Sequence, residues 1–201
     1  MSTQAKTFLT PEEYLAIERK AEYKSQYYRG EMFAMAGASL AHNTLVANSI
    51  GELHGKLRGG ACRVLPSDMR VRVSATGLYT YPDVVAVCGE PRLLDNQLDT
   101  LLNPHLIVEV LSLSTEAYDR GRKFEHYQTI ESLREYLLLA TDRVRADLYT
   151  RQPDGRWLLT SATRLEDSLD LQSVGCSLSL AGLYERVDLA EPESTAAESR
   201  P

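Results

Sequence analysis

Two acidic residues stand in the most apolar surroundings of this sequence, and carboxylates are the side chains that hold hard divalent cations. Asp83 lies in the segment YPDVVAV at residues 81–87, and Glu109 lies in LIVEVL at residues 106–111. Short runs of aliphatic and β-branched residues predict strands that are buried on both faces. A buried carboxylate without a counter-charge is costly or stays protonated. A divalent cation shared by Asp83 and Glu109 would supply that counter-charge.

Two carboxylates on one ion indicate metal-dependent hydrolysis of phosphodiester bonds. Mg²⁺ takes oxygen ligands, commonly one or two carboxylates, and keeps several waters. Because neighbouring strands lie about 4.8 Å apart, carboxylates on one face of adjacent strands can share an ion. Asp83 alone has a simpler explanation as the strand-entry residue after Pro82. Glu109, among four aliphatic neighbours, has little structural explanation, so together they predict a Mg²⁺ or Mn²⁺ site.

A lysine in the following helix is the candidate for a cation near the reacting groups. Asp119, Lys123 and Tyr127 recur every four residues in a helix predicted over residues 115–130, so they share one face. A short loop at residues 112–114 would fold this helix back over the Glu109 strand. Lys123 would then reach the attacking water and the charge that develops on the phosphate. The alternative is an ordinary ion pair between Asp119 and Lys123 on the surface.

Other polar residues are weaker candidates for the site. Glu31 also sits in an apolar strand, which leaves a role at the metal and a surface role both open. His42, near the start of a predicted helix, either contacts the site or a phosphate, or it caps or packs that helix. Asp68 has the simple explanation of a strand edge. The remaining histidines share no spacing that would predict metal ligation: His54, His105 and His126.

The elements that must position these residues follow from hydrophobic periodicity and turn signals. They predict an α+β or mixed α/β protein with a central mixed sheet flanked by helices. We expect one domain over residues 1–189 and a disordered tail over residues 190–201, which are rich in Pro, Glu, Ser and Ala. Residues 89–103 are expected to form a loop. Helices are predicted over residues 11–21, 39–57 and 115–130, and strands over 25–35 (with a turn at Arg29-Gly30), 62–65, 69–73, 81–87, 106–111, 134–140, 144–150 and 156–159.

Composition narrows the class of protein and its partners. The chain has 201 residues and a net charge of −6, which argues against a broad basic surface for nucleic acid. The sequence contains no apolar run of bilayer-spanning length and no signal-peptide core, so we expect a cytoplasmic protein without membrane contact. Three cysteines with no metal-binding spacing are expected to be reduced core residues: Cys62, Cys88 and Cys176.

Taken together, the acidic strands, the lysine helix and several short motifs of this sequence resemble the PD-(D/E)XK nuclease superfamily and, more closely, the Uma2 family of restriction-endonuclease-like proteins. The resemblance runs from about Thr10 to Trp157, and its strength lies in the order and spacing of short motifs. The matching segments are YRGE at 28–31, GAS at 37–39 with His42-Asn43, SDMRV at 67–71, YPDVV at 81–85, VEVLS at 108–112, Asp119 through Lys123 to Tyr127, and EYL at 135–137.

The resemblance implies a restriction-endonuclease-like fold, a Mg²⁺ site and nuclease chemistry, with Asp83 and Glu109 as metal ligands. The superfamily's lysine would stand two residues after Glu109, where this chain has Leu111, so its role is assigned to Lys123. DNA is the expected substrate, and a homodimer is expected because cutting a duplex requires two sites. The alternative is a catalytically degenerate module that uses the same fold for binding or oligomerisation.

Overall fold

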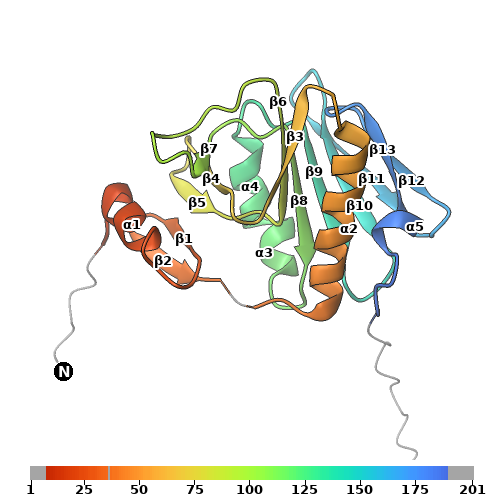
Figure 1. Ribbon diagram of the computed structural model, residues 1–201, viewed down its shortest axis with the longest axis horizontal. Coiled ribbons are helices and arrows are strands. Elements are labelled where there is room, and N and C mark those ends of the chain that lie inside the picture. The colour runs from red at the N-terminus through yellow and green to blue at the C-terminus, as the bar shows by residue number, and fades with distance from the viewer. Residues whose placement is uncertain (1–7, 36, 190–201) are drawn as a thin grey trace, which may run out of the picture.

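A six-stranded mixed sheet forms the centre of the protein (Figure 1). The computed structural model describes residues 8–35 and 37–189, so the tail predicted over residues 190–201 lies outside the described residues. Strands β8 and β9 are parallel, and all other neighbours in this sheet are antiparallel. Across the sheet the strands are β11 (Trp157–Ala162), β10 (Ala146–Arg151), β9 (Glu135–Ala140), β8 (Leu106–Leu111), β6 (Val84–Cys88) and β3 (Cys62–Pro66).

Two smaller sheets accompany the central one. A five-stranded sheet is built from strands between residues 25 and 101 and includes one parallel pair, β4 with β7. A two-stranded hairpin lies near the C-terminus. The first sheet contains, in order, β2 (Glu31–Ala34), β1 (Ser25–Tyr28), β5 (Leu78–Thr80), β4 (Arg70–Val73) and β7 (Thr100–Leu101), and the hairpin contains β12 (Ser168–Leu171) and β13 (Cys176–Ser179).

The core has two layers, one on each face of the central sheet. On β8, Val108 and Val110 point to one face, whereas Ile107 and Leu111 point to the other, as the two-residue period of a strand requires. Helix α2 (Leu40–Leu57) and the β12–β13 hairpin cover the first face, and helix α4 (Arg122–Gln128) and the five-stranded sheet cover the second. The remaining helices are α1 (Pro11–Glu18), α3 (Glu116–Arg120) and α5 (Leu180–Leu183).

Local signals in the sequence explain where several elements begin. The Thr10 side chain accepts from the backbone N–H of Glu13, whose carboxylate accepts from the Thr10 N–H, which confirms the predicted start of α1. Arg29 and Gly30 have φ of 48° and 88°, the two positive values that a two-residue hairpin turn between β1 and β2 requires. This turn confirms the predicted break between the two strands.

The predicted helix over residues 115–130 is in fact two helices. Gly121 adopts φ −110° and ψ −104° and separates α3 from α4. A Cβ at Gly121 would lie 3.0 Å from the carbonyl oxygen of Ala117, so a side chain there would crowd the backbone at this bend. Thr115, at the start of α3, makes no capping hydrogen bond from its side chain.

Two further expectations are corrected by the structure. Asp83 lies just before β6 rather than inside it, because the strand begins at Val84. The expected loop over residues 89–103 contains the short strand β7, whose parallel pairing with β4 has no local sequence signal. In the predicted strand over residues 69–73, Arg70 is only 2% exposed, and its guanidinium donates to Tyr81 and Thr100 and pairs with Asp99.

The prediction of three reduced cysteines is also wrong for two of them. Cys62 and Cys88 face each other across the antiparallel β3–β6 pair and form a disulfide. The sequence hides this proximity, since the two residues are 26 positions apart. Cys176 is free and half-buried, as expected.

Among residues 8–35 and 37–189, the helices are all too short or too polar to cross a lipid bilayer.

Candidate active site

The two acids singled out in the sequence meet at one end of the central sheet. Val84 of β6 lies opposite Val108 of β8, so Asp83 falls next along the ladder, beside Glu109. The Val110 backbone N–H donates to Asp83 Oδ2 over 2.8 Å, which fixes the Asp83 carboxylate against the strand that carries Glu109. This end is also where the parallel strands β8 and β9 have their carboxyl termini.

Glu109 is held from the helical side by two donors that use the same oxygen. Lys123 Nζ lies 2.8 Å from Glu109 Oε1, and the Tyr127 hydroxyl donates to that oxygen, also over 2.8 Å. Lys123 and Tyr127 are both buried on α4, one turn apart. The Glu109 carboxylate is therefore held in place through Oε1 by two donors from one helix.

Lys123 also pairs with a second carboxylate, Asp119 on α3. Its Nζ lies 3.0 Å from Asp119 Oδ1, and Asp119, Lys123 and Glu109 are 3%, 6% and 4% exposed. The interpretation of Asp119 and Lys123 as a surface ion pair is therefore wrong, because α3 and α4 press this pair onto the sheet. An ammonium has three N–H donors, and two of them are accounted for by these carboxylates.

The site carries more negative than positive charge. Burial raises the pKa of Glu109 to about 8, and the charges of Asp119 and Asp83 act in the same direction, against the opposing effect of Lys123. Burial lowers the pKa of Lys123, but the carboxylates of Glu109 and Asp119 outweigh it and the net shift is upward. Lys123 therefore stays an ammonium, and three carboxyl groups share a single cation.

His42 approaches the site from the opposite face of the sheet. It lies in the first turn of α2, where the Ser39 side chain accepts from its backbone N–H over 3.2 Å. Its Nε2 lies 3.3 Å from Asp83 Oδ2, and the half-buried ring leaves Nδ1 buried without a hydrogen-bond partner among the described residues. The imidazole therefore contacts the site and is not only a packing group.

The donor set fits a divalent cation of the kind that keeps most of its water. In the part of the chain that the structure describes, no group of three or more His, Cys, Asp or Glu side chains is arranged to hold a metal. Mg²⁺, however, is often held by one or two carboxylates and completed by water. Asp83 keeps 18% of its side-chain surface exposed and Glu109 keeps 5%, so Asp83 is the more open of the two carboxylates. The excess negative charge is what such an ion would offset.

The other residues considered in the sequence lie in settings of their own, and the role of Glu31 at a metal stays a prediction. Glu31 begins β2 opposite Tyr28 and is half-buried. Asp68 is an exposed partner of Lys24, in agreement with a strand-edge role. The three other histidines lie apart from Asp83 in different settings: His105 accepts from the backbone N–H of Cys88, His126 packs its ring on Tyr28, and His54 is exposed on α2.

Two tyrosines at the site were not assigned a role from the sequence. The four-residue spacing placed Tyr127 on the same face as Lys123, but nothing in the sequence showed that its hydroxyl would reach Glu109. Tyr118 of α3 donates to Gln26 of β1 over 3.4 Å, which ties the N-terminal sheet to the site. Burial raises the pKa of Tyr118, and the charge of Lys123 opposes that shift, so Tyr118 lies within the electrostatic reach of the ammonium.

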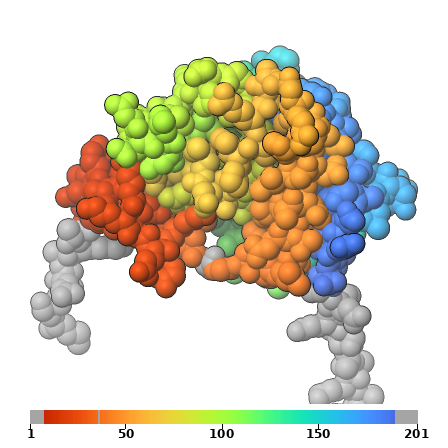
Figure 2. Space-filling view, viewed as in Figure 1, coloured from red at the N-terminus to blue at the C-terminus, as the bar shows by residue number. Residues whose placement is uncertain are grey.

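The space-filling view shows how the surface is shaped near these elements. In Figure 2 a recess separates the N-terminal hairpin from the start of helix α2, and green atoms from the middle of the chain are visible at its base. In Figure 1 the ends of β8 and α3 lie behind this region.

The sequence and the fold both have known relatives. The Uma2 family, described as "Putative restriction endonuclease", matches residues 11–181. Two proteins of Synechocystis sp. are similar to the chain. Uncharacterized protein slr1290 is 38% identical, with 88% of this chain and 91% of the relative covered, and sll1609 is 40% identical, with 76% and 86% covered.

A crystal structure of a putative nuclease of DUF820 from Anabaena variabilis has the same fold. Its TM-score is 0.71 at 15% sequence identity, and the match covers 88% of this chain and 97% of that one. This likeness confirms the restriction-endonuclease-like fold expected from the sequence. Because the family match covers most of the chain and two relatives exceed one-third identity, the protein belongs to the Uma2 family.

Proposed function

We propose that this protein is a Mg²⁺-dependent endonuclease that hydrolyses phosphodiester bonds in nucleic acid. The observation that carries the proposal is the fixed pair of carboxylates: Asp83 is bonded to the backbone of Val110, and Glu109 receives both Lys123 and Tyr127 on one oxygen. The family description and the name of the Anabaena structure support nuclease chemistry.

Asp83 and Glu109 would hold the ion through the oxygens that the protein leaves available. When bound, Mg²⁺ (or Mn²⁺) supplies Lewis acidity toward the phosphate and lowers the pKa of a coordinated water. Tyr127 and Lys123 keep Glu109 from rotating. His42 does the same for Asp83 from the other face of the sheet.

Lys123 is the residue for charge stabilisation. Its ammonium is held by Glu109 and Asp119, so its remaining N–H is pre-oriented. A fixed donor in a water-poor site stabilises developing negative charge strongly because little reorganisation is needed. In the proposed reaction, Lys123 orients the attacking water or donates to the phosphate oxygen on which charge accumulates. Glu31 is a further candidate for a metal ligand or a base-orienting group.

DNA is the proposed substrate and a homodimer the proposed assembly. The described body is acidic, so a single copy offers little basic surface for a duplex, and two copies would supply one site for each strand.

Cleavage assays with purified variants test this proposal. Supercoiled plasmid, linear duplex, single-stranded DNA and RNA are incubated with Mg²⁺ or Mn²⁺ and with EDTA. We expect metal-dependent cleavage by the wild type and at least a hundredfold loss in D83N and E109Q. D68N is a matched control because Asp68 is an exposed acid, with 83% of its side-chain surface accessible.

The same variants distinguish an enzyme from a degenerate module. Circular dichroism and thermal unfolding would show that D83N and E109Q remain folded. If either variant cleaves as fast as the wild type, the assignment of the site is refuted. If the wild type cleaves none of these substrates and binds no Mn²⁺ saturably, the chain uses the nuclease fold only for binding or oligomerisation.

A further inference from the structure

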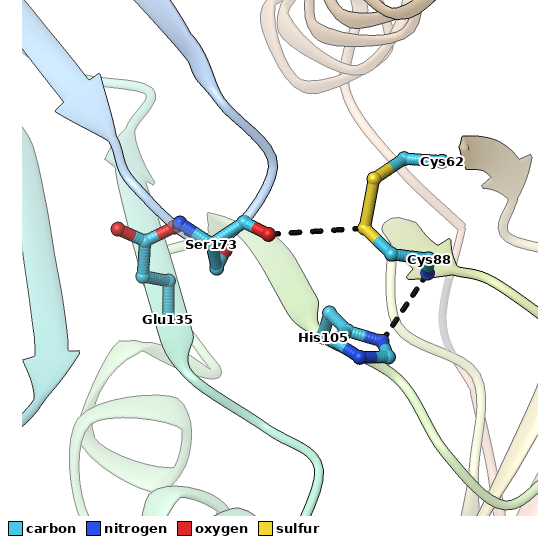
Figure 3. Close-up of a disulfide and its surroundings, with 5 residues drawn as sticks. All are labelled: Cys62, Cys88, His105, Glu135 and Ser173. Atoms are coloured by element: carbon cyan, nitrogen blue, oxygen red, sulfur yellow. Dashed lines mark hydrogen bonds between the residues drawn. A yellow bond between two sulfur atoms is a disulfide. The ribbon is translucent and has the colours of Figure 1, made fainter. Parts of the chain in front are cut away.

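The Cys62–Cys88 disulfide lies at the end of the β3–β6 ladder, in different surroundings on its two sides (Figure 3). On the Cys88 side, Sγ lies 3.8 Å from the carbonyl oxygen of Ser173, and the Cys88 N–H donates to His105 Nδ1 over 3.2 Å. The Ser173 segment is itself fixed, since its N–H and hydroxyl both donate to the buried carboxylate of Glu135. Both cysteines are half-buried, but the side of Cys88 is occupied by the Ser173 carbonyl and the His105 ring.

On the Cys62 side there is open space. Cys62 lines a surface pocket of about 240 Å³ between the end of α2 and the start of β3, and Cys88 is not part of its lining. Three basic or imidazole side chains surround the opening: His54, Arg58 and Arg63. The lining contains no acidic residue, and Arg58 and Arg63 are exposed. The pocket therefore favours an anionic molecule next to the sulfur of Cys62.

We propose that this disulfide is a reversible redox site, opened at Cys62 by an anionic thiol of the glutathione class that binds in the pocket. The size of the pocket suits part of a small peptide thiol. The guanidinium groups of Arg58 and Arg63 would pair with its carboxylates. A sulfur is attacked where a thiolate can reach it, which on this geometry is Cys62 and not Cys88.

The reaction balances with two thiols. The first thiolate attacks Sγ of Cys62, the Cys62–Cys88 bond breaks, and Cys88 leaves as a thiolate that takes up a proton. The resulting mixed disulfide on Cys62 is then attacked by a second thiol, which releases the oxidised thiol dimer and the free Cys62 thiol. Two thiols are oxidised and the protein disulfide is reduced. The reverse sequence, from the oxidised dimer, restores the bond.

Reduction kinetics with two thiols of different charge test the proposal. The full-length oxidised protein is treated with reduced glutathione or with neutral 2-mercaptoethanol, quenched with iodoacetamide and mapped by mass spectrometry. We expect the mixed disulfide on Cys62. We also expect the double variant R58Q/R63Q to react about tenfold more slowly with glutathione, because steering by local charge changes association rates by this order. Its rate with 2-mercaptoethanol should stay unchanged.

The double variant R156Q/R164Q is the matched control. It removes the same charge from two exposed arginines near β11, at the opposite edge of the sheet from β3. It should react like the wild type with both thiols. The proposal is overturned if the adduct forms on Cys88 or Cys176, if both double variants slow glutathione equally, or if oxidised glutathione fails to form the Cys62–Cys88 bond in the reduced protein.

Discussion

Removal of the ammonium of Lys123 should destabilise the protein in a manner that depends on pH. Lys123 Nζ lies 2.8 Å from Glu109 Oε1 and 3.0 Å from Asp119 Oδ1. At an effective dielectric constant near 20, each contact corresponds to about 6 kcal/mol of Coulomb energy. Desolvation of the three groups offsets much of that energy. The usual net cost of removing one partner from a buried pair is about 3–5 kcal/mol.

We therefore expect K123M to lose about 3–5 kcal/mol of unfolding free energy at pH 9. At that pH Glu109, whose pKa burial raises to about 8, is ionised in the folded protein. Without Lys123 the folded-state pKa of Glu109 rises further, because the ammonium that opposes the effect of burial is gone. A carboxyl with a raised pKa binds more protons when folded than when unfolded, so its folded state becomes less stable as pH rises. At pH 5 the loss should fall to about 1 kcal/mol, because methionine preserves most of the packing.

Urea unfolding followed by circular dichroism at pH 5, 7 and 9 provides the measurement. K56M is the matched control, since Lys56 pairs with Glu52 at 3.2 Å with both side chains at least one-third exposed. An exposed pair of this kind contributes about 0.3–0.5 kcal/mol at any of these pH values. An equal loss in K123M at pH 5 and pH 9, or a loss no larger than that of K56M, would refute the description of a buried, over-acidic cluster.

Three other outcomes are expected. Y127F should lose about 1–2 kcal/mol of unfolding free energy, because Glu109 loses one of its two fixed donors. For the same reason its Mn²⁺ affinity, measured by calorimetry, should fall about tenfold. Unchanged affinity would exclude a positioning role for Tyr127. Mn²⁺ affinity should rise about tenfold per pH unit from pH 6 to 8 and then level off, because Glu109 is protonated below its raised pKa and must lose that proton when the metal binds. An affinity that does not change with pH would contradict this. The hydrogen bond from Arg19, with a further contribution from Arg70, lowers the pKa of Asp99, so its stabilising effect is present above about pH 4 and lost below it. At pH 7, D99N should therefore have a lower melting temperature than the wild type and lose about 1–2 kcal/mol of unfolding free energy. The melting temperatures of the two proteins should converge below about pH 4.

The sequence predicts those parts of the fold that depend on local pattern. The capping box at Thr10, the hairpin turn at Arg29-Gly30 and the buried strand around Glu109 each follow from residue types within a few positions. Features that depend on contacts between distant segments were missed. Strand β7 has only two residues and exists through its pairing with β4. The Cys62–Cys88 disulfide depends on the register of two strands that the local sequence does not encode.

The candidate site, too, could be predicted only where it depends on local sequence. An acid among aliphatic residues marked Glu109, and four-residue spacing placed Lys123 and Tyr127 on one face. The break at Gly121 was missed, yet Asp119 and Lys123 still meet because both short helices pack on the same face of the sheet. The contact between His42 and Asp83 joins elements on opposite faces, and only the three-dimensional structure reveals it.

Anomalous diffraction from crystals of the protein grown with Mn²⁺ tests the central claim most directly. We expect one strong peak in contact with carboxylate oxygens of both Asp83 and Glu109, and loss of that peak in crystals of E109Q. A Mn²⁺ peak that contacts neither carboxylate, or none at saturating Mn²⁺, would contradict the account.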